Sequence, residues 1–150
     1  MIVVNTSYQA ALWADALFAM DRQWWQTYRA DIRARFRGER FSVNAIEGVQ
    51  RRRLETCGNS GAGAIALAAA GGARRIVLLG YDGQYAADGK RHWHGDHPRH
   101  LGNAAQIGTW AAGFAKLAKA LRHVEIINAS RATALTCWPC QPLEEVLACP

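Results

Sequence analysis

Short apolar runs alternate along this chain with longer stretches of helical periodicity. The apolar runs are rich in Val, Ile, Leu and Phe and do not alternate with polar residues, which predicts strands that are buried on both faces. The five predicted strands are Ile2–Val4, Ala16–Met20, Phe41–Val43, Ile76–Leu79 and Val124–Ile127. The four predicted helices are Arg22–Phe36, Ser60–Ala70, Asn103–Leu121 and Pro142–Leu147.

This order of elements predicts the fold class. Strands that alternate with helices favour a mostly parallel sheet with helices on both faces, because a parallel connection needs a long crossover. We therefore expect an α/β protein with a Rossmann-like three-layer sandwich and a sheet of about five strands. The 150 residues are enough for one domain with one core, spanning 1–150.

Small polar residues follow each predicted strand. They are Asn5, Asp21, Asn44, Asp82 and Asn128. The carboxyl ends of parallel strands share one edge, so we expect these residues to line a single crevice, where α/β proteins bind ligands. Each one alone is weak evidence, because Asn and Asp also end strands simply by forming turns.

Two further segments carry candidate ligand contacts. Ser60 and Gly61 open the helix that begins at Ser60, where backbone N–H groups and the helix dipole favour a phosphate or carboxylate. The same small residues would also allow the helix to pack closely on the sheet. After the last strand, Asn128 and Ser130 could bond the polar edge of a ligand or cap the next turn.

The loop His92-Trp-His-Gly-Asp-His97 is the densest group of ionisable side chains. It matches the H-x-H-x-D-H pattern of metallo-β-lactamase-type hydrolases, which gives a metal site the alternative ligands His92, His94, Asp96 and His97. We expect no stoichiometric metal, because the further ligands that such sites take from distant loops are missing. His123 does not supply one, because it lies at the start of a strand and therefore at the wrong edge for the crevice. The favoured interpretation is a catalytic or binding loop without metal, and a plain surface loop is the other alternative.

Composition narrows the partner and the compartment. No apolar run reaches the roughly 18–20 residues of a membrane helix, and the first residues lack the features of a signal peptide, so we expect a cytoplasmic protein with no membrane partner. The net charge of +6 is compatible with an anionic partner or with a solvated helix face. No nucleic-acid motif accompanies it, which favours a small nucleotide ligand over nucleic acid.

Cys137 and Cys140 form a C-x-x-C late in the chain, and we interpret them as reduced thiols.

The chain resembles a known group of proteins along nearly its whole length. The resemblance is based on three motifs: Asn59-Ser-Gly61, the strand ending Gly80-Tyr-Asp82 and the loop from Gly89-Lys90 to His97-Pro98. They resemble small phage- and prophage-encoded Rossmann-like proteins. More distantly, they are similar to bacterial CMP-sialic-acid-dependent sialyltransferases and to motility-accessory and hydroxymethylpterin-diphosphokinase-like proteins. Relatives carry an earlier strand with a phosphate turn, which we expect this domain to lack.

The resemblance implies roles for individual residues. It implies a nucleotide or nucleotide-sugar ligand, no other cofactor, and a histidine that acts as general base. His97 would hold that place, with His92, His94 and His100 as alternatives, and Asn128 and Ser130 would touch the nucleotide. The expected function is nucleotide or nucleotide-sugar binding, with glycosyl or other group transfer if the protein is an enzyme.

Other functions and an oligomer remain compatible with the sequence. One is a non-catalytic phage protein that sequesters a host nucleotide signal in the host cytoplasm. Another is a metal-dependent hydrolase that uses the histidine loop. The sequence is equally compatible with a monomer and with a homo-oligomer.

Overall fold

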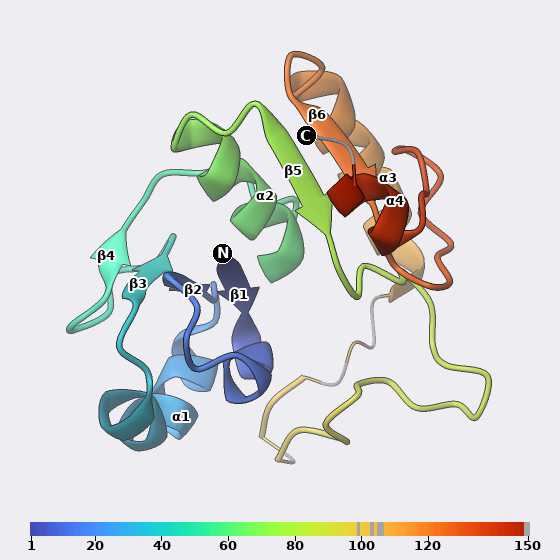
Figure 1. Cartoon of the computed structure of the whole chain (residues 1–150). Helices are drawn as coiled ribbons and strands as arrows, with labels where there is room; N and C mark the ends of the chain where they lie inside the picture. The colour runs from blue at the N-terminus through green and yellow to red at the C-terminus, as the bar shows by residue number, and fades with distance from the viewer. Residues whose placement is uncertain (99, 103, 105–106, 149–150) are drawn as a thin grey trace. The chain divides into compact units, whose positions relative to one another are not determined.

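The computed structural model describes residues 1–98, 100–102, 104 and 107–148, and it forms two compact units, Met1–Ala68 and Ala69–Pro150. The elements of the first unit are β1 (Ile2–Val4), the 3-10 helix η1 (Asn5–Ala10), β2 (Ala16–Phe18), α1 (Arg22–Arg35), β3 (Glu39–Ser42), β4 (Gln50–Arg51) and most of α2 (Ser60–Ala70) (Figure 1). The second unit contains β5 (Arg75–Leu78), α3 (Ile107–Ala120), β6 (Glu125–Asn128) and α4 (Leu143–Ala148).

The first unit is built on a four-stranded sheet in the order β1-β2-β3-β4, in which every neighbouring pair is parallel. The register places Val4 opposite Phe18 and Phe18 opposite Phe41. All three residues of β2 are buried, as the apolar run predicts for a central strand covered on both faces. The carboxyl ends of β1, β2 and β3 therefore lie side by side at one edge.

Helix α2 covers one face of this sheet. Ala64 and Leu67 of the helix pack in one buried cluster with Phe18 and Phe41 of the strands. Gly63 allows the close approach, because a Cβ at this position would lie 2.4 Å from Cε1 of Phe18. The sequence Ser-Gly-Ala-Gly-Ala thus supplies a helix surface thin enough to lie directly on aromatic side chains.

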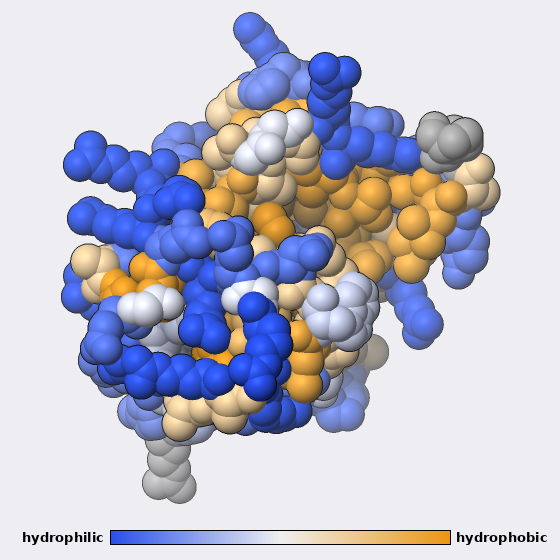
Figure 2. All heavy atoms as spheres, turned by 60° about the vertical axis from the view of Figure 1, so that its left-hand side comes forward, coloured by the Kyte–Doolittle hydropathy of each residue, from blue (hydrophilic) through white to orange (hydrophobic). Residues whose placement is uncertain are grey.

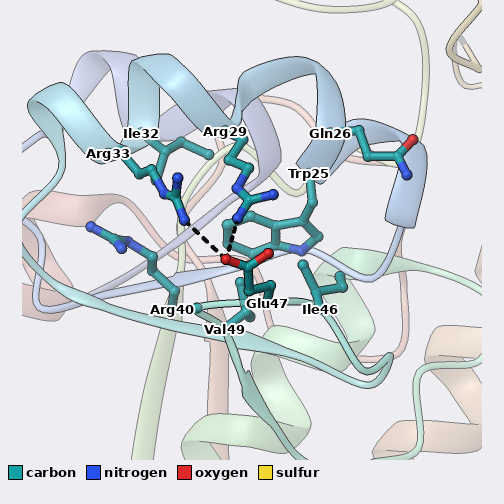
Figure 3. Close-up of a pocket in the computed structure, with 10 residues that line it drawn as sticks. Trp25, Gln26, Arg29, Ile32, Arg33, Arg40, Ile46, Glu47 and Val49 are labelled. Atoms are coloured by element: carbon teal, nitrogen blue, oxygen red, sulfur yellow. Dashed lines mark hydrogen bonds and ion pairs between the residues drawn. The ribbon is translucent and has the colours of Figure 1, made fainter.

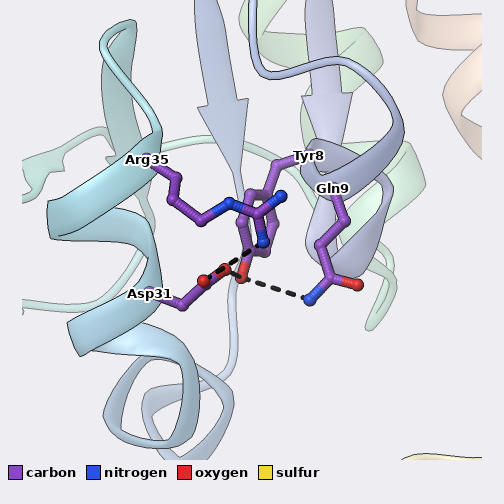
Figure 4. A network of polar contacts seen from close by, with 4 residues as sticks. All are labelled: Tyr8, Gln9, Asp31 and Arg35. Carbon is purple, nitrogen blue, oxygen red and sulfur yellow. Dashed lines mark hydrogen bonds and ion pairs between the residues drawn. The ribbon is translucent and has the colours of Figure 1, made fainter.

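An aromatic cluster forms the other layer, where α1 lies on the side of the sheet away from α2 (Figure 1). Tyr8 of η1 meets Trp24, Tyr28 and Phe36 of the α1 region edge-on, with ring centroids 6.1–6.4 Å apart. The Tyr8 hydroxyl donates a hydrogen bond to the Asp31 carboxylate. Gln9 and Arg35 complete this polar group (Figure 4).

The second unit contains a parallel pair, β5 and β6, in which Leu78 lies opposite Asn128. Phe114 of α3 packs against Tyr81, which follows β5, and against Trp138, with centroid distances of 5.9 and 5.7 Å. Among the described residues of the long connection from β5 to α3, none belongs to a helix or strand.

The expected parallel α/β organisation is confirmed, as sheets of four and of two strands. The predicted strands and helices are all present, with bounds that differ by a few residues, and the predicted start of α3 at Asn103 lies outside the described residues. The sequence analysis missed η1 and β4. Both are short. The two residues of β4 are exposed and polar, so no apolar run marks this edge strand, and it is recognised only by its pairing with β3.

The surface carries both charged and apolar side chains. Figure 2 shows long hydrophilic side chains beside areas of hydrophobic surface on one face. Large hydrophobic side chains that are exposed include Trp13 and Trp93. Within the described part of the chain, every helix is too short or too polar to cross a membrane.

Candidate functional site

The carboxyl edge of the four-stranded sheet brings together four polar positions from segments far apart in the sequence. Asn5 follows β1, Asp21 follows β2 and precedes α1, Asn44 follows β3, and Ser60 opens α2. Two hydrogen bonds on Met20 hold two of them at the end of β2. The Ser60 Oγ accepts from the Met20 N–H at 3.2 Å, and the Asn44 Nδ2 donates to the Met20 carbonyl at 2.7 Å. Asn44 and Ser60 therefore meet next to Asp21.

Asn5 and Asp21 are two residues of this edge whose side-chain oxygens offer acceptors to a ligand. The Oδ1 of Asn5 is buried and has no hydrogen-bond partner among the described residues, and the Asn5 backbone is left-handed with φ of 48°. Asp21 occupies the N-cap position of α1, yet its exposed side chain makes no capping hydrogen bond. A carboxylate and an amide oxygen both accept hydrogen bonds, so they suit a ligand that presents hydroxyl or amino groups.

The start of α2 is already capped by the chain itself. The Oδ1 of Asn59 accepts from the N–H groups of Gly61 and Ala62 at 2.7 and 3.2 Å. An anion at this helix end would have to displace the Asn59 side chain. The structure thus gives Ser60 and Gly61 a role in local architecture, and a ligand contact there would require rearrangement of the cap.

The carboxyl edge of β5 and β6 is organised around the backbone of Tyr81. Asn128 is fully buried and donates from Nδ2 to the Tyr81 carbonyl and to the Thr133 hydroxyl, both at 3.1 Å. Ser130 accepts from the Tyr81 N–H at 2.8 Å, and Thr133 donates to the same Tyr81 carbonyl at 2.8 Å. Asn128 and Ser130 therefore fix the loop that leads into Asp82.

Asp82 is the exposed member of this edge. Its backbone carbonyl accepts from the Ala134 N–H at 2.7 Å, which fixes the position of the residue. Partial desolvation raises the pKa of its carboxyl group above the ordinary value. Of the three residues predicted in this unit, Asp82 has the side chain that a ligand can reach. Thr133 was not predicted from the sequence, because it does not directly follow a predicted strand.

The histidine loop brings three imidazole rings together. The rings of His92, His94 and His97 have centroids 4.8–5.1 Å apart, and one ligating atom of each lies within 4.8 Å of the others. Burial lowers the pKa of all three rings, and for His97 to about 4. A base with such a pKa is neutral at pH 7 but accepts a proton weakly, which does not favour His97 as a general base. Asp96 is not a member of this group.

A pocket that sequence analysis did not identify lies between α1 and the segment after β3 (Figure 3). Arg29, Arg33 and Arg40 line it, and Glu47 lies among them, 2.7 Å from Arg29 and 3.5 Å from Arg33. The Arg29 guanidinium holds the pKa of Glu47 below its ordinary value. The carboxylate thus takes the place that an external anion would occupy.

The cysteines show no metal or redox arrangement among the described residues. Cys137 and Cys140 form no disulfide among the described residues, and Cys149 lies outside the described part of the chain. Burial raises the pKa of the Cys137 thiol, which opposes the thiolate that redox chemistry needs.

Comparison with protein-family models, with curated proteins and with solved structures found no match to this chain. We therefore infer the function from the hydrogen bonds, burial and charges of the chain's own residues.

Proposed function

We propose that this protein binds a nucleotide or nucleotide sugar at the carboxyl ends of its parallel strands. The observation that carries this proposal is the buried, unpartnered Oδ1 of Asn5. A buried acceptor without a hydrogen bond costs about 1–3 kcal/mol, and a ligand hydroxyl or amino group would remove that cost. The orphan acceptor lies at the edge where α/β proteins bind ligands.

The charges of the neighbouring residues favour the hydroxyl-bearing part of such a ligand at this position. The negative charge of the Asp21 carboxylate would repel a phosphate, and the Asp21 and Asn5 oxygens together would accept hydrogen bonds from ribose or sugar hydroxyls. Ser60 and Asn44 act as positioning residues, because they hold the backbone of Met20, the residue before Asp21. The strand edge of the second unit offers a separate candidate contact, Asp82, in a loop held by Asn128 and Ser130.

We propose the finer fold assignment on the same basis. A single Rossmann-like domain with a three-layer sandwich is supported by the parallel pairing in both sheets and by the helices on both faces of the first sheet. The resemblance to phage-encoded Rossmann-like proteins points the same way.

Binding without turnover and group transfer make different demands on the histidine loop. A transferase that uses a histidine of the loop needs a proton acceptor with a pKa near the working pH, and the lowered pKa of His97 makes it a poor one. A protein that sequesters a host nucleotide signal needs only the binding residues. Incubation with the bound nucleotide followed by chromatography separates the two functions, since a sequestering protein returns the nucleotide unchanged and a transferase does not.

Calorimetry with nucleoside monophosphates and nucleotide sugars tests the binding proposal. We expect Asn5→Gly to weaken binding about 2- to 10-fold and Asp21→Asn about 10- to 100-fold, from the energies of neutral and charge-assisted hydrogen bonds. Glu39→Gln is the matched control, because Glu39 begins β3 at the opposite end of the strand and should not affect affinity. Wild-type affinity in both Asn5→Gly and Asp21→Asn would refute the assignment of this edge.

A further inference from the structure

Three histidines of one loop converge in a way that a metal-free protein does not require. His92, His94 and His97 lie with their rings 4.8–5.1 Å apart, and the rings of His92 and His94 are parallel to within 7°. One nitrogen from each ring lies within 4.8 Å of the other two. Three lone-pair donors thus surround one small volume.

The local backbone explains why these three side chains meet. The Gly95 N–H donates to the His92 carbonyl at 3.2 Å, which closes a turn over residues 92–95. Gly95 adopts a φ of +84°, which a residue with a Cβ rarely accepts, so glycine permits the chain to reverse here. The reversal returns His97 to the side of His92 and His94.

The chemistry of the group fits a metal ion better than a hydrogen-bonded cluster. The Nε2 of His92 is buried without a hydrogen-bond partner among the described residues. All three rings are partly buried. A neutral imidazole nitrogen with a lone pair is a ligand for transition metals, and a cation at this position would supply the partner that the described residues do not give the Nε2 of His92.

The distances are close to those of a ligated site. A tetrahedral zinc ion with Zn–N bonds of about 2.0–2.1 Å separates its nitrogen ligands by about 3.4 Å. The three histidine nitrogens, which lie within 4.8 Å of one another, would need to move inward by less than about 1 Å each, a shift that side-chain rotation provides.

We propose that His92, His94 and His97 form a binding site for one divalent transition-metal ion of the zinc class. Imidazole ligands suit Zn²⁺, Co²⁺, Ni²⁺ and Cu²⁺, whereas Mg²⁺ and Ca²⁺ prefer oxygen ligands. Three protein ligands leave one tetrahedral position for water or an external ligand, which is the arrangement of catalytic zinc sites. Asp96 lies in the same loop, next to His97, and is not one of the three proposed ligands.

This proposal departs from our expectation of no stoichiometric metal. That expectation required further ligands from distant loops, whereas the proposed site takes its three ligands from one loop. The metal-dependent hydrolase hypothesis requires this site. The nucleotide-binding proposal does not, and the two can be tested separately.

Calorimetric titration of chelator-treated, tag-free protein with ZnCl₂ tests the proposal. We expect one Zn²⁺ per chain. His92→Ala, His94→Ala and His97→Ala should each weaken binding by more than about 100-fold, because losing even an outer partner of a metal ligand costs about 10- to 100-fold. His123→Ala is the control, since His123 is exposed and lies outside the cluster. Circular dichroism verifies that each variant is folded.

A second measurement uses only the wild-type protein. The chain has five histidines, and NMR of their imidazole nitrogens should show that Zn²⁺ shifts three of them, those of His92, His94 and His97. The proposal is overturned if any one of the three variants binds Zn²⁺ as the wild type does. It is also overturned if His123→Ala weakens binding equally or if the wild type binds no zinc.

Discussion

The hydroxyl of Ser60, in the first turn of α2, accepts a hydrogen bond of 3.2 Å from the backbone N–H of Met20, forty positions earlier in the chain. This bond fixes the end of β2 to the start of α2. We expect Ser60→Ala to lower the free energy of unfolding by about 0.5–1.5 kcal/mol, because the part-buried Met20 N–H loses its partner. Urea unfolding of Ser60→Ala measures the effect. Ser60→Thr keeps a hydroxyl and should recover part of it.

Gly63 should tolerate no side chain, whereas Gly108 should. An added Cβ at Gly63 would lie 2.4 Å from the Phe18 ring, and nothing lies within 4 Å of a Cβ at Gly108. We expect Gly63→Ala to destabilise the protein by about 1–3 kcal/mol through overpacking. Gly108→Ala, in the first turn of α3, should be neutral or stabilising by up to about 1 kcal/mol. Thermal unfolding of the two variants tests this, and equal effects would contradict the close packing of α2.

The Tyr8–Asp31 hydrogen bond should make stability depend on pH at the alkaline end. Burial and the Asp31 carboxylate raise the pKa of Tyr8 to about 12 from an ordinary value of about 10. The folded state therefore holds the phenolic proton more tightly than the unfolded state. The resulting stabilisation is complete below about pH 10 and is lost as the pH rises to about 12. In Tyr8→Phe this loss should disappear from unfolding curves measured against pH.

The Tyr8→Phe variant should also change the pKa of Asp31. The Tyr8 hydroxyl is the main cause of the lowered pKa of Asp31, and Arg35 is a further one. We expect the pKa of Asp31 to rise in Tyr8→Phe while Arg35 still holds it below the ordinary value, as measured by NMR titration. At neutral pH the cost in stability should be about 1 kcal/mol, since water reaches the part-exposed Asp31 and weakens the bond. An unchanged pKa would contradict the hydrogen bond.

Substitutions of Asn128 and Asp82 should have different effects, the first on stability and the second on ligand binding. Asn128 is fully buried and bonds to Tyr81, Thr133 and Ser130. We expect Asn128→Ala to destabilise the protein by about 2–4 kcal/mol, because the Ser130 N–H loses its acceptor, the Tyr81 carbonyl and the Thr133 hydroxyl each lose one hydrogen bond, and a cavity is created. Asp82→Asn should leave the melting temperature nearly unchanged and weaken nucleotide binding. Calorimetry together with thermal unfolding distinguishes these roles, and a stable Asn128→Ala would show that the network is dispensable.

The sequence was enough to predict the parallel α/β organisation and to place the strand ends to within a few residues. The run Ala16–Phe18 is apolar at every position, which predicts a strand covered on both faces, and the polar residue after each strand lies at the carboxyl edge once the strands are parallel. Such features depend on residues close together in the chain. They do not require knowledge of the partners.

The tertiary structure alone decided what each polar side chain does. Ser130 bonds to a backbone group 49 residues away and Ser60 to one 40 residues away, so strand pairing had to bring these groups together before their roles as positioning residues could be seen. The convergence of His92, His94 and His97 likewise depends on the left-handed turn at Gly95, which residue spacing does not reveal. Hydrogen bonds and metal ligands act over about 2–3 Å, and only the folded backbone fixes side chains to that precision.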